Sequence, residues 1–289
     1  MGTPTADPGG VLLVDKPAGM TSHDVVAIVR RATGARRAGH TGTLDPFATG
    51  LLVVLTGRGT RLIPYVEQEP KVYEATIRFG AETDTDDATG GVTREAAPPH
   101  PAAVDDAIAR LTGAIDQMPP AYSAKQVGGT RAYAAARRGA PLELQPCRVV
   151  VHSWSILART DESLTARVSC GAGTYVRALA RDLGRLANSA AHLAALRRVQ
   201  AGPFSVSDAV SLDDLETGAF SPLPLAAAVP SLPVQRLASD ELRRVLHGNT
   251  VAPRVTAERV ALLGDDDSLI AVAEPEDGAL RPRLVLRDA

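Results

Sequence analysis

Strict alternation of apolar and polar side chains is the feature that most constrains how this 289-residue chain can fold. Between Lys71 and Gly80, four apolar side chains lie on one face and polar side chains on the other, which is typical of a half-buried β-strand. Residues 164–170 repeat the pattern, and residues 176–186 then place their apolar side chains at helical spacing. The chain is therefore expected to combine strands that have one buried face with amphipathic helices.

The N-terminal part carries signals for a helix, a loop and a buried strand. Thr21 and Asp24 predict a capping box at the start of an apolar-periodic helix that Gly34 ends. The uninterrupted aliphatic run at residues 51–55 predicts a buried strand. The segment between them, residues 39–50, is dense in Gly and Thr and is expected to form a loop.

The C-terminal part is predicted to be a separate unit. Four prolines in residues 221–233 predict a linker, so we place one unit at residues 1–225 and a small, mostly β unit at residues 232–289. Ser239 is expected to cap a helix closed by Gly248. Short strands are expected at residues 260–263, 269–273 and 284–286.

The charge distribution is more informative than the total. The net charge of −2 argues mildly against a nucleic-acid partner, because phosphate binding usually leaves a basic footprint. Residues 123–150 and 159–200 nevertheless carry +4 each, and residues 82–106 carry −6. These runs are consistent either with a basic surface facing an acidic one or with solvated faces.

Several function classes find no support. The first ten residues lack the basic and apolar regions of a signal peptide, and no apolar run approaches the roughly 20 residues that span a bilayer, so a cytoplasmic protein is expected. Residues 34–41 approach a phosphate-binding loop, but His40 replaces the required lysine. Asp84 and Asp86 occupy calcium-loop positions without the obligatory glycine, so an exposed acidic loop is expected. Cys147 and Cys170 are expected to be reduced, buried thiols.

The loop at residues 39–50 holds the main candidate for catalysis. It offers one carboxylate, Asp45, near one imidazole, His40. From the residues alone, Asp45 is either a turn residue before Pro46 or a catalytic group that a rigid scaffold aims.

Residues 39–52, GHTGTLDPFATGLL, resemble the active-site motif of the bacterial tRNA pseudouridine-55 synthases, the TruB type. The resemblance implies an enzyme that isomerises uridine 55 in the T-loop of tRNA to pseudouridine without a cofactor or metal. It also implies an α+β pseudouridine synthase fold, with a mixed, largely antiparallel sheet and a small C-terminal β domain of the PUA kind. Further matching blocks follow in the family's order at residues 11–22, 71–73, 120–124, 173–177 and 196–198.

The resemblance assigns roles to individual residues. It implies that Asp45 is the nucleophile, that His40 and Thr43 shape the uridine pocket, and that Tyr73 stacks on the base. Arg177 resembles the arginine that pairs with the nucleophile, and a nearby cation keeps a carboxylate ionised. On pattern alone, Tyr73 would be a core residue and Arg177 a solvated helix residue.

Three more residues are assigned to substrate binding by the same resemblance. Leu196 corresponds to an apolar lid against the base, although a core leucine would look identical. Tyr175 and Lys16 belong to matching blocks, and their alternative interpretations are a first-turn aromatic and a surface lysine.

The implied reaction breaks the N1–C1′ bond, turns the uracil over and joins C5 to C1′. The uridine must first be flipped out of the folded RNA, at a cost of a few kcal/mol, of which stacking on an aromatic returns about 1–3 kcal/mol. Asp45 could bond to C1′, bond to C6 or abstract a ribose proton, and the sequence does not choose.

The expected partner is tRNA, bound through its T-stem-loop by a monomer without an evident protein partner. Residues 123–150 align with a mobile RNA-gripping arm of the family, and an ordinary amphipathic surface is the alternative. Two rival functions remain: an RNA-binding protein without turnover, which has no use for a buried nucleophile, and a glycoside hydrolase, which needs two flanking carboxylates.

Overall fold

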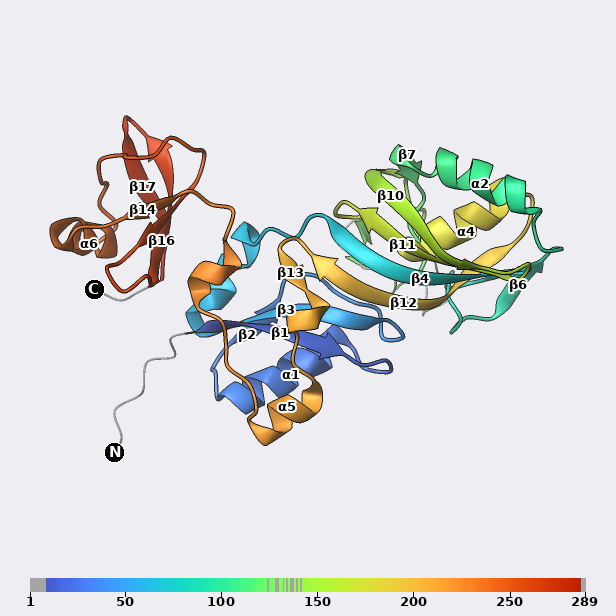
Figure 1. Ribbon diagram of the computed structural model, residues 1–289, viewed down its shortest axis with the longest axis horizontal. Coiled ribbons are helices and arrows are strands. Elements are labelled where there is room, and N and C mark those ends of the chain that lie inside the picture. The colour runs from blue at the N-terminus through green and yellow to red at the C-terminus, as the bar shows by residue number, and fades with distance from the viewer. Residues whose placement is uncertain are drawn as a thin grey trace.

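The structure is a computed structural model that describes residues 9–286, apart from residues 124, 128–129, 132, 134, 136–137, 139 and 141. A long central sheet, flanked by helices, leads into a smaller C-terminal sheet at the opposite end of the molecule from α2 and α4 (Figure 1). Within the described part of the chain, no helix has the length and apolar character needed to cross a membrane.

The central sheet is mixed and largely antiparallel. Among its described strands, β12 and β3 pair in parallel, at Arg197 and Arg198, and the other strand pairs are antiparallel. Two short strands, β2 (Ala38–His40) and β13 (Phe204–Ser205), attach at its side. The predicted fold class is therefore confirmed. The main strands run in the order β1 (Gly10–Lys16), β3 (Thr49–Thr56), β12 (Ala191–Ala201), β4 (Lys71–Phe79), β11 (Ser163–Cys170), β10 (Cys147–Arg159) and β7 (Gly113–Gln117).

Strand β4 shows why the alternation predicts the fold. Tyr73 and the three apolar residues at every second position after it are all buried, and they share a core with β11 and with α4 (Val176–Leu186). Leu179 and Leu183 of α4 are fully buried, and burial of one such side chain stabilises a protein by about 1.5–3 kcal/mol. Helix α2 (Pro101–Arg110) packs into the same core.

The N-terminal helix and the following loop mostly follow the prediction. Helix α1 (Ser22–Thr33) begins with the expected Thr21–Asp24 capping box and ends at Gly34, whose φ of 66° is left-handed. The loop is shorter than expected, because β2 takes its first residues and β3 begins at Thr49. Pairing with β3 extends the chain there in spite of its Gly and Thr content.

The C-terminal sheet has its own buried cluster. It contains β14 (Val234–Arg236), β15 (Val260–Leu263), β16 (Leu269–Glu276) and β17 (Ala279–Val285), with α6 (Ser239–Leu246) beside it. Ser239 does not cap α6, because the helix already includes it and Glu241 instead accepts the N–H of Ala238 at the cap. The strands after residue 268 are longer than predicted, since pairing across the hairpin carries them past their apolar residues.

The proline-rich connection is packed rather than free. Leu223 pairs with Val11, and η3 (Leu225–Ala228) follows directly. Ala228 and Val229 are buried in a cluster that holds side chains of both sheets. The remaining short elements are η1 (Gly57–Tyr65), β5 (Ala81–Thr83), β6 (Val92–Glu95), β8 (Gln126–Val127), β9 (Thr130–Arg131), η2 (Val206–Asp208) and α5 (Leu212–Thr217).

Candidate active site

The loop that carries Asp45 is anchored on both sides by the core. Leu44 and Ala48 are buried in the same cluster as β4 and α4. The Ser22 hydroxyl accepts a hydrogen bond from the Leu44 N–H at 2.8 Å and donates to the Leu44 carbonyl at 3.2 Å. Asp45 therefore sits on a loop whose neighbours cannot move independently of the core.

Lys16 anchors the Asp45 loop through hydrogen bonds to backbone carbonyls. Its side chain is fully buried, and Nζ donates to the carbonyls of Pro17 (2.8 Å), Met20 (2.7 Å) and Pro46 (3.2 Å). Burial lowers its pKa to about 8, although the carboxylates of Asp45 and Asp24 oppose that shift. The interpretation of Lys16 as a surface lysine is thus wrong, and its three N–H groups are all taken by the protein.

Arg198 ties the two flanks of the loop together. Its buried guanidinium donates from Nε to the Leu51 carbonyl at 2.8 Å and from Nη2 to the Gly42 carbonyl at 2.9 Å. Gly50 lies against the same strand with φ of 100°, and a Cβ there would come within 2.3 Å of the Arg198 carbonyl oxygen. Only glycine fits this close approach.

Asp45 is held by Arg177 in a two-point ion pair. Arg177 donates from Nε to Oδ2 of Asp45 at 2.8 Å and from Nη2 to Oδ1 at 3.2 Å. The Arg177 side chain is only 5% exposed, whereas that of Asp45 is 36% exposed. The carboxylate is therefore oriented from the protein side and open on the other, which an attacking group requires.

The open side of Asp45 faces a cavity of about 220 Å³. Six of the predicted site residues line it: Thr43, Asp45, Tyr73, Tyr175, Arg177 and Leu196. His40 and Lys16 are not among its lining residues. Tyr73 and Leu196 belong to the buried core and also line the cavity, so a place in the core does not remove either residue from the site.

His40 lies next to this loop at the end of β2. Its ring meets the ring of His23 edge to face, with centroids 5.7 Å apart. Burial lowers the pKa of His40, and the charges of His23 and Arg198 act in the same direction, which favours a neutral imidazole. Its Nδ1 is buried and has no hydrogen-bond partner among the described residues.

Lys71 is a lining residue that the sequence analysis missed. It precedes Tyr73 by two positions on β4, so the alternation that placed Tyr73 also puts Lys71 on the cavity side. Burial lowers the pKa of Lys71, and the nearby Arg198 cation lowers it further. Burial also raises the pKa of the Tyr73 hydroxyl, which therefore stays protonated at neutral pH.

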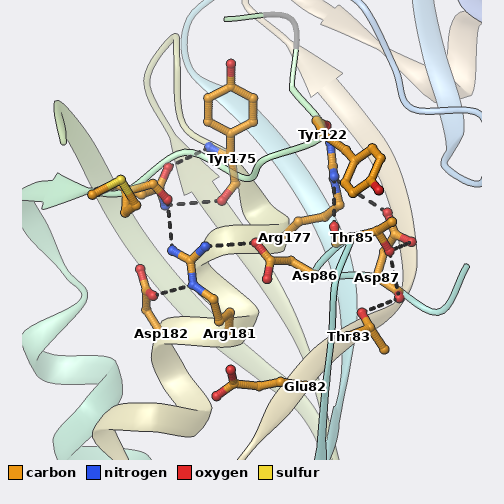
Figure 2. A network of polar contacts seen from close by, with 12 residues as sticks. Glu82, Thr83, Thr85, Asp86, Asp87, Tyr122, Tyr175, Arg177, Arg181 and Asp182 are labelled. Carbon is orange, nitrogen blue, oxygen red and sulfur yellow. Dashed lines mark hydrogen bonds and ion pairs between the residues drawn. The ribbon is translucent and has the colours of Figure 1, made fainter. Parts of the chain in front are cut away.

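The acidic segment after β5 is exposed only in part: Asp84 is exposed as predicted, whereas Asp86 and Asp87 are buried, contrary to the prediction. Asp86 and Asp87 are 8% and 4% exposed because arginines of α4 pair with them (Figure 2). Asp87 Oδ2 lies 3.7 Å from Arg177 Nε, and Arg177 also donates from Nη1 to the Thr85 carbonyl at 2.9 Å. The opposing charges lie about 90 positions apart in the chain, so no local pattern indicates this pairing.

A second missed residue, Gln117, fixes the start of α4. Its side-chain amide accepts from the Tyr175 N–H at 2.9 Å and donates to the Tyr175 carbonyl at 3.1 Å. Five residues later, the Tyr122 carbonyl accepts from Arg177 Nη2 at 2.9 Å. Residues 117–122, which lead into the basic segment, are thus hydrogen-bonded to the start of α4, the helix whose Arg177 pairs with Asp45.

The basic segment 123–150 is described only in part. The side chain of Arg131 and all of Arg137 lie outside the described residues. Lys125, Arg138 and Arg148 are exposed. Cys147 at its end is half-exposed rather than buried, with its sulfur 3.0 Å from Lys125 Nζ, whereas Cys170 is buried as predicted.

No cluster of three or more metal-ligating side chains occurs in the part of the chain that the structure describes. The lining of the cavity is dominated by one carboxylate, two arginines and one lysine beside aromatic and aliphatic walls. This arrangement suits a reaction carried by a single oriented carboxylate on a planar, polar substrate.

Comparison with protein families places the chain in a class. The model of the TruB family pseudouridylate synthase N-terminal domain matches residues 30–176, and that of the tRNA pseudouridylate synthase B C-terminal domain matches residues 177–221. The chain therefore belongs to the TruB family of pseudouridylate synthases, which confirms the resemblance found in the sequence and makes the protein an isomerase.

Two curated relatives and one solved structure are similar to most of the chain. The tRNA pseudouridine synthase B of Thermobifida fusca is 47% identical over 287 residues, 96% of this chain and 98% of that protein. The tRNA pseudouridine synthase B of Symbiobacterium thermophilum is also 47% identical, over 85% of this chain and 83% of that protein. A solved H/ACA ribonucleoprotein bound to a substrate RNA containing 2′-deoxyuridine shares the fold, with a TM-score of 0.72 and 22% identity over 96% of this chain and 85% of that chain.

Proposed function

We propose that this protein converts uridine 55 in the T-loop of tRNA to pseudouridine, with Asp45 as the nucleophile. Its relatives in Thermobifida fusca and Symbiobacterium thermophilum carry the name tRNA pseudouridine synthase B, which supports a tRNA substrate. The observation that carries the proposal is the two-point ion pair from Arg177 to Asp45 at the wall of the cavity.

The walls of the cavity suit a nucleobase that has been flipped out of the RNA stack. Tyr73 offers an aromatic face and Leu196 an apolar contact, and both line the cavity with Asp45. Stacking on Tyr73 would return about 1–3 kcal/mol of the few kcal/mol that flipping costs. We therefore assign Tyr73 and Leu196 to the two faces of the flipped uracil, and Thr43 and Tyr175 to the rim.

The chemistry rests on the ionised Asp45. Arg177 aligns both carboxylate oxygens and leaves them accessible, so Asp45 can attack C1′ or C6, or take a ribose proton. In each route the N1–C1′ bond breaks, the uracil turns within the cavity and C5 bonds to C1′. C5 then loses its proton, which restores the C5–C6 double bond, and N1 takes up a proton, so substrate and product are isomers and no cofactor is consumed.

Lys16 and His40 enter the proposal differently from the other site residues. Because its N–H groups all bond to carbonyls, Lys16 acts by holding the catalytic loop and not by touching RNA. His40 lies outside the cavity lining but beside the catalytic loop, and we assign its neutral ring to shaping that loop around the uridine.

The wider arrangement follows from the substrate. We propose that residues 1–225 form the catalytic unit, that residues 123–150 grip the T-stem-loop, and that residues 232–289 form a small PUA-like unit. The exposed Lys125, Arg138 and Arg148 supply cations for phosphate contacts. A tRNA substrate implies a cytoplasmic protein, and we propose a monomer because residues of a single chain line the cavity.

The test is to map the modified position on a full-length unmodified tRNA by carbodiimide labelling and mass spectrometry. We expect pseudouridine at position 55, and none when cytidine replaces that uridine. Tight binding without any pseudouridine would contradict the proposal and favour an RNA-binding protein without turnover. Conversion at another position would contradict the assigned target.

A further inference from the structure

Arg181 joins three parts of the chain through one buried guanidinium. Nη1 donates to Asp86 Oδ2 at 2.8 Å, Nη2 to the Met118 carbonyl at 2.8 Å and Nε to Asp182 Oδ1 at 2.9 Å (Figure 2). Its side chain is 9% exposed, and Arg181 is not among the residues that line the cavity. Every nitrogen of the guanidinium is thus bonded inside the protein, away from the cavity.

Arg177 and Arg181 donate hydrogen bonds to the same two segments of the chain, residues 85–86 and residues 118–122. Arg177, one turn earlier on α4, donates to the carbonyl of Thr85, the neighbour of Asp86, and to that of Tyr122, four residues after Met118. The two arginines therefore lie between the acidic segment on one side and the start of the basic segment on the other. Arg177 alone continues to Asp45.

The acidic segment depends on this cation. Asp86 has a left-handed backbone with φ of 61°, and its carbonyl accepts the N–H of Leu193 on β12 at 3.1 Å. Burial raises the pKa of Asp86, and Arg181 is the foremost group opposing that rise. Without Arg181, a buried carboxylate and the Met118 carbonyl would both lose their partner, and the segment would shift to regain one.

We propose that Arg181 is a positioning residue of the active site, which acts through Arg177 to fix the orientation of Asp45. By holding Asp86 and the Met118 carbonyl, it keeps the Thr85 and Tyr122 carbonyls where Arg177 donates to them. With those two bonds in place, the Nε edge of Arg177 stays directed at Asp45. This inference rests on the proposed function, because the orientation of Asp45 matters only to a reaction at that carboxylate.

The structure also offers a matched control on the same helix. Arg185 lies one turn beyond Arg181 and donates from Nε and Nη2 to the buried Glu82, at 3.0 and 2.6 Å. Glu82 belongs to the strand that precedes the acidic segment, β5. Among the described residues, Arg185 makes no hydrogen bond to the Thr85 or Tyr122 carbonyl. Its side chain is 56% exposed, so its loss removes a more exposed cation from a buried carboxylate and leaves the hydrogen bonds of Arg177 intact.

The experiment compares Arg181→Met, Arg181→Lys and Arg185→Met under single-turnover conditions on T-stem-loop RNA. We expect the rate at saturating protein to fall about 10- to 100-fold in Arg181→Met, with RNA affinity unchanged, because small misplacements of a reacting group cost rate. Arg181→Lys should recover part of the rate, since an ammonium can pair with Asp86 but lacks the planar fork. Arg185→Met should lose thermal stability and keep the native rate.

Two results would overturn the inference. One is a native rate in folded Arg181→Met; the other is an equal loss of rate in Arg185→Met, which would mean that stability alone is measured. If Arg181→Met does not fold, Arg181→Lys and Asp86→Asn take its place, and native rates in both would overturn the inference equally. An inactive native protein would instead contradict the proposed function, so the two failures are distinguishable.

Discussion

Buried arginines lie beside the central sheet, whereas the described arginines of the C-terminal sheet are exposed. On α4, beside the central sheet, the Arg177 and Arg181 side chains are 5% and 9% exposed and each contacts more than one segment. In the C-terminal sheet, the Arg236 and Arg283 side chains are 61% and 38% exposed and pair with carboxylates that water also reaches. The residue type is the same, and the difference lies in burial and in the number of partners.

This difference decides what an ion pair contributes. Exposed pairs gain little, because water screens the charges and two long side chains lose freedom. A buried pair is not a strong source of stability either, but removing one partner leaves an uncompensated charge, which is costly. We infer that α4 uses buried arginines to impose geometry on the active site, whereas the C-terminal sheet uses exposed ones as a soluble surface.

The largest expected effect is on the buried side. Arg177→Met should destabilise the protein by about 3–5 kcal/mol, because it leaves the buried Asp87 without its cation and two carbonyls without their donor. The same change should reduce the single-turnover rate at least 100-fold, since Asp45 loses its orientation. Urea unfolding and single-turnover assays measure the two effects, and a variant with native stability would break the comparison between the sheets.

A smaller effect is expected from the carboxylate at the far end of the same network. Burial acts to raise the pKa of Glu82, but hydrogen bonds from Arg185 and Arg94 outweigh it, so the pKa lies below its ordinary value of 4.5. A lowered pKa stabilises the folded state above pH 4.5, and this contribution is lost as the pH falls through the folded pKa. Glu82→Gln should therefore be less stable than the native protein at pH 7.

The pH dependence is the sharper part of this prediction. The difference in unfolding free energy between the native protein and Glu82→Gln should shrink as the pH is lowered below about 4.5, where the unfolded carboxyl takes up its proton. Denaturant unfolding at several values between pH 3 and 7 checks it. A difference independent of pH would show that Glu82 contributes packing and not charge.

The smallest effect is expected at the surface of the C-terminal sheet. Arg283 pairs with Glu274 and Glu276 at 3.1 and 3.3 Å, but water reaches all three side chains. Arg283→Ala should leave the melting temperature and the reaction rate unchanged within error. A clear loss of stability would mean that exposure is a poor guide to the role of arginine in this chain.

Much of the fold follows from patterns that are local in the sequence. The alternation in β4, the helical spacing of α4 and the capping box at Thr21 each depend on residues within one element. The predicted boundaries were less accurate where pairing with a distant strand lengthened an element, as at β2 and β16. Local propensity cannot specify such pairing, because the partner strand lies elsewhere in the chain.

The sequence predicted the residues at the centre of the site but not the buried charges around them. The motif around Asp45 and the block holding Arg177 indicated the pair that the structure brings together. Lys16 and Asp86, however, carry charges whose expected place is the surface, and both are buried. Their partners are backbone carbonyls or side chains far along the chain, and a charge is buried only when such partners converge on it.

The most direct measurement of the central claim is the single-turnover rate of Asp45→Asn on T-stem-loop RNA, with the RNA affinity determined in parallel. Asparagine keeps the shape of the side chain but removes the negative charge that Arg177 orients and that the reaction requires. We predict that the variant binds the RNA as the native protein does and forms no pseudouridine. Conversion at a rate near that of the native protein would contradict Asp45 as the nucleophile and, with it, the role assigned to the arginines of α4.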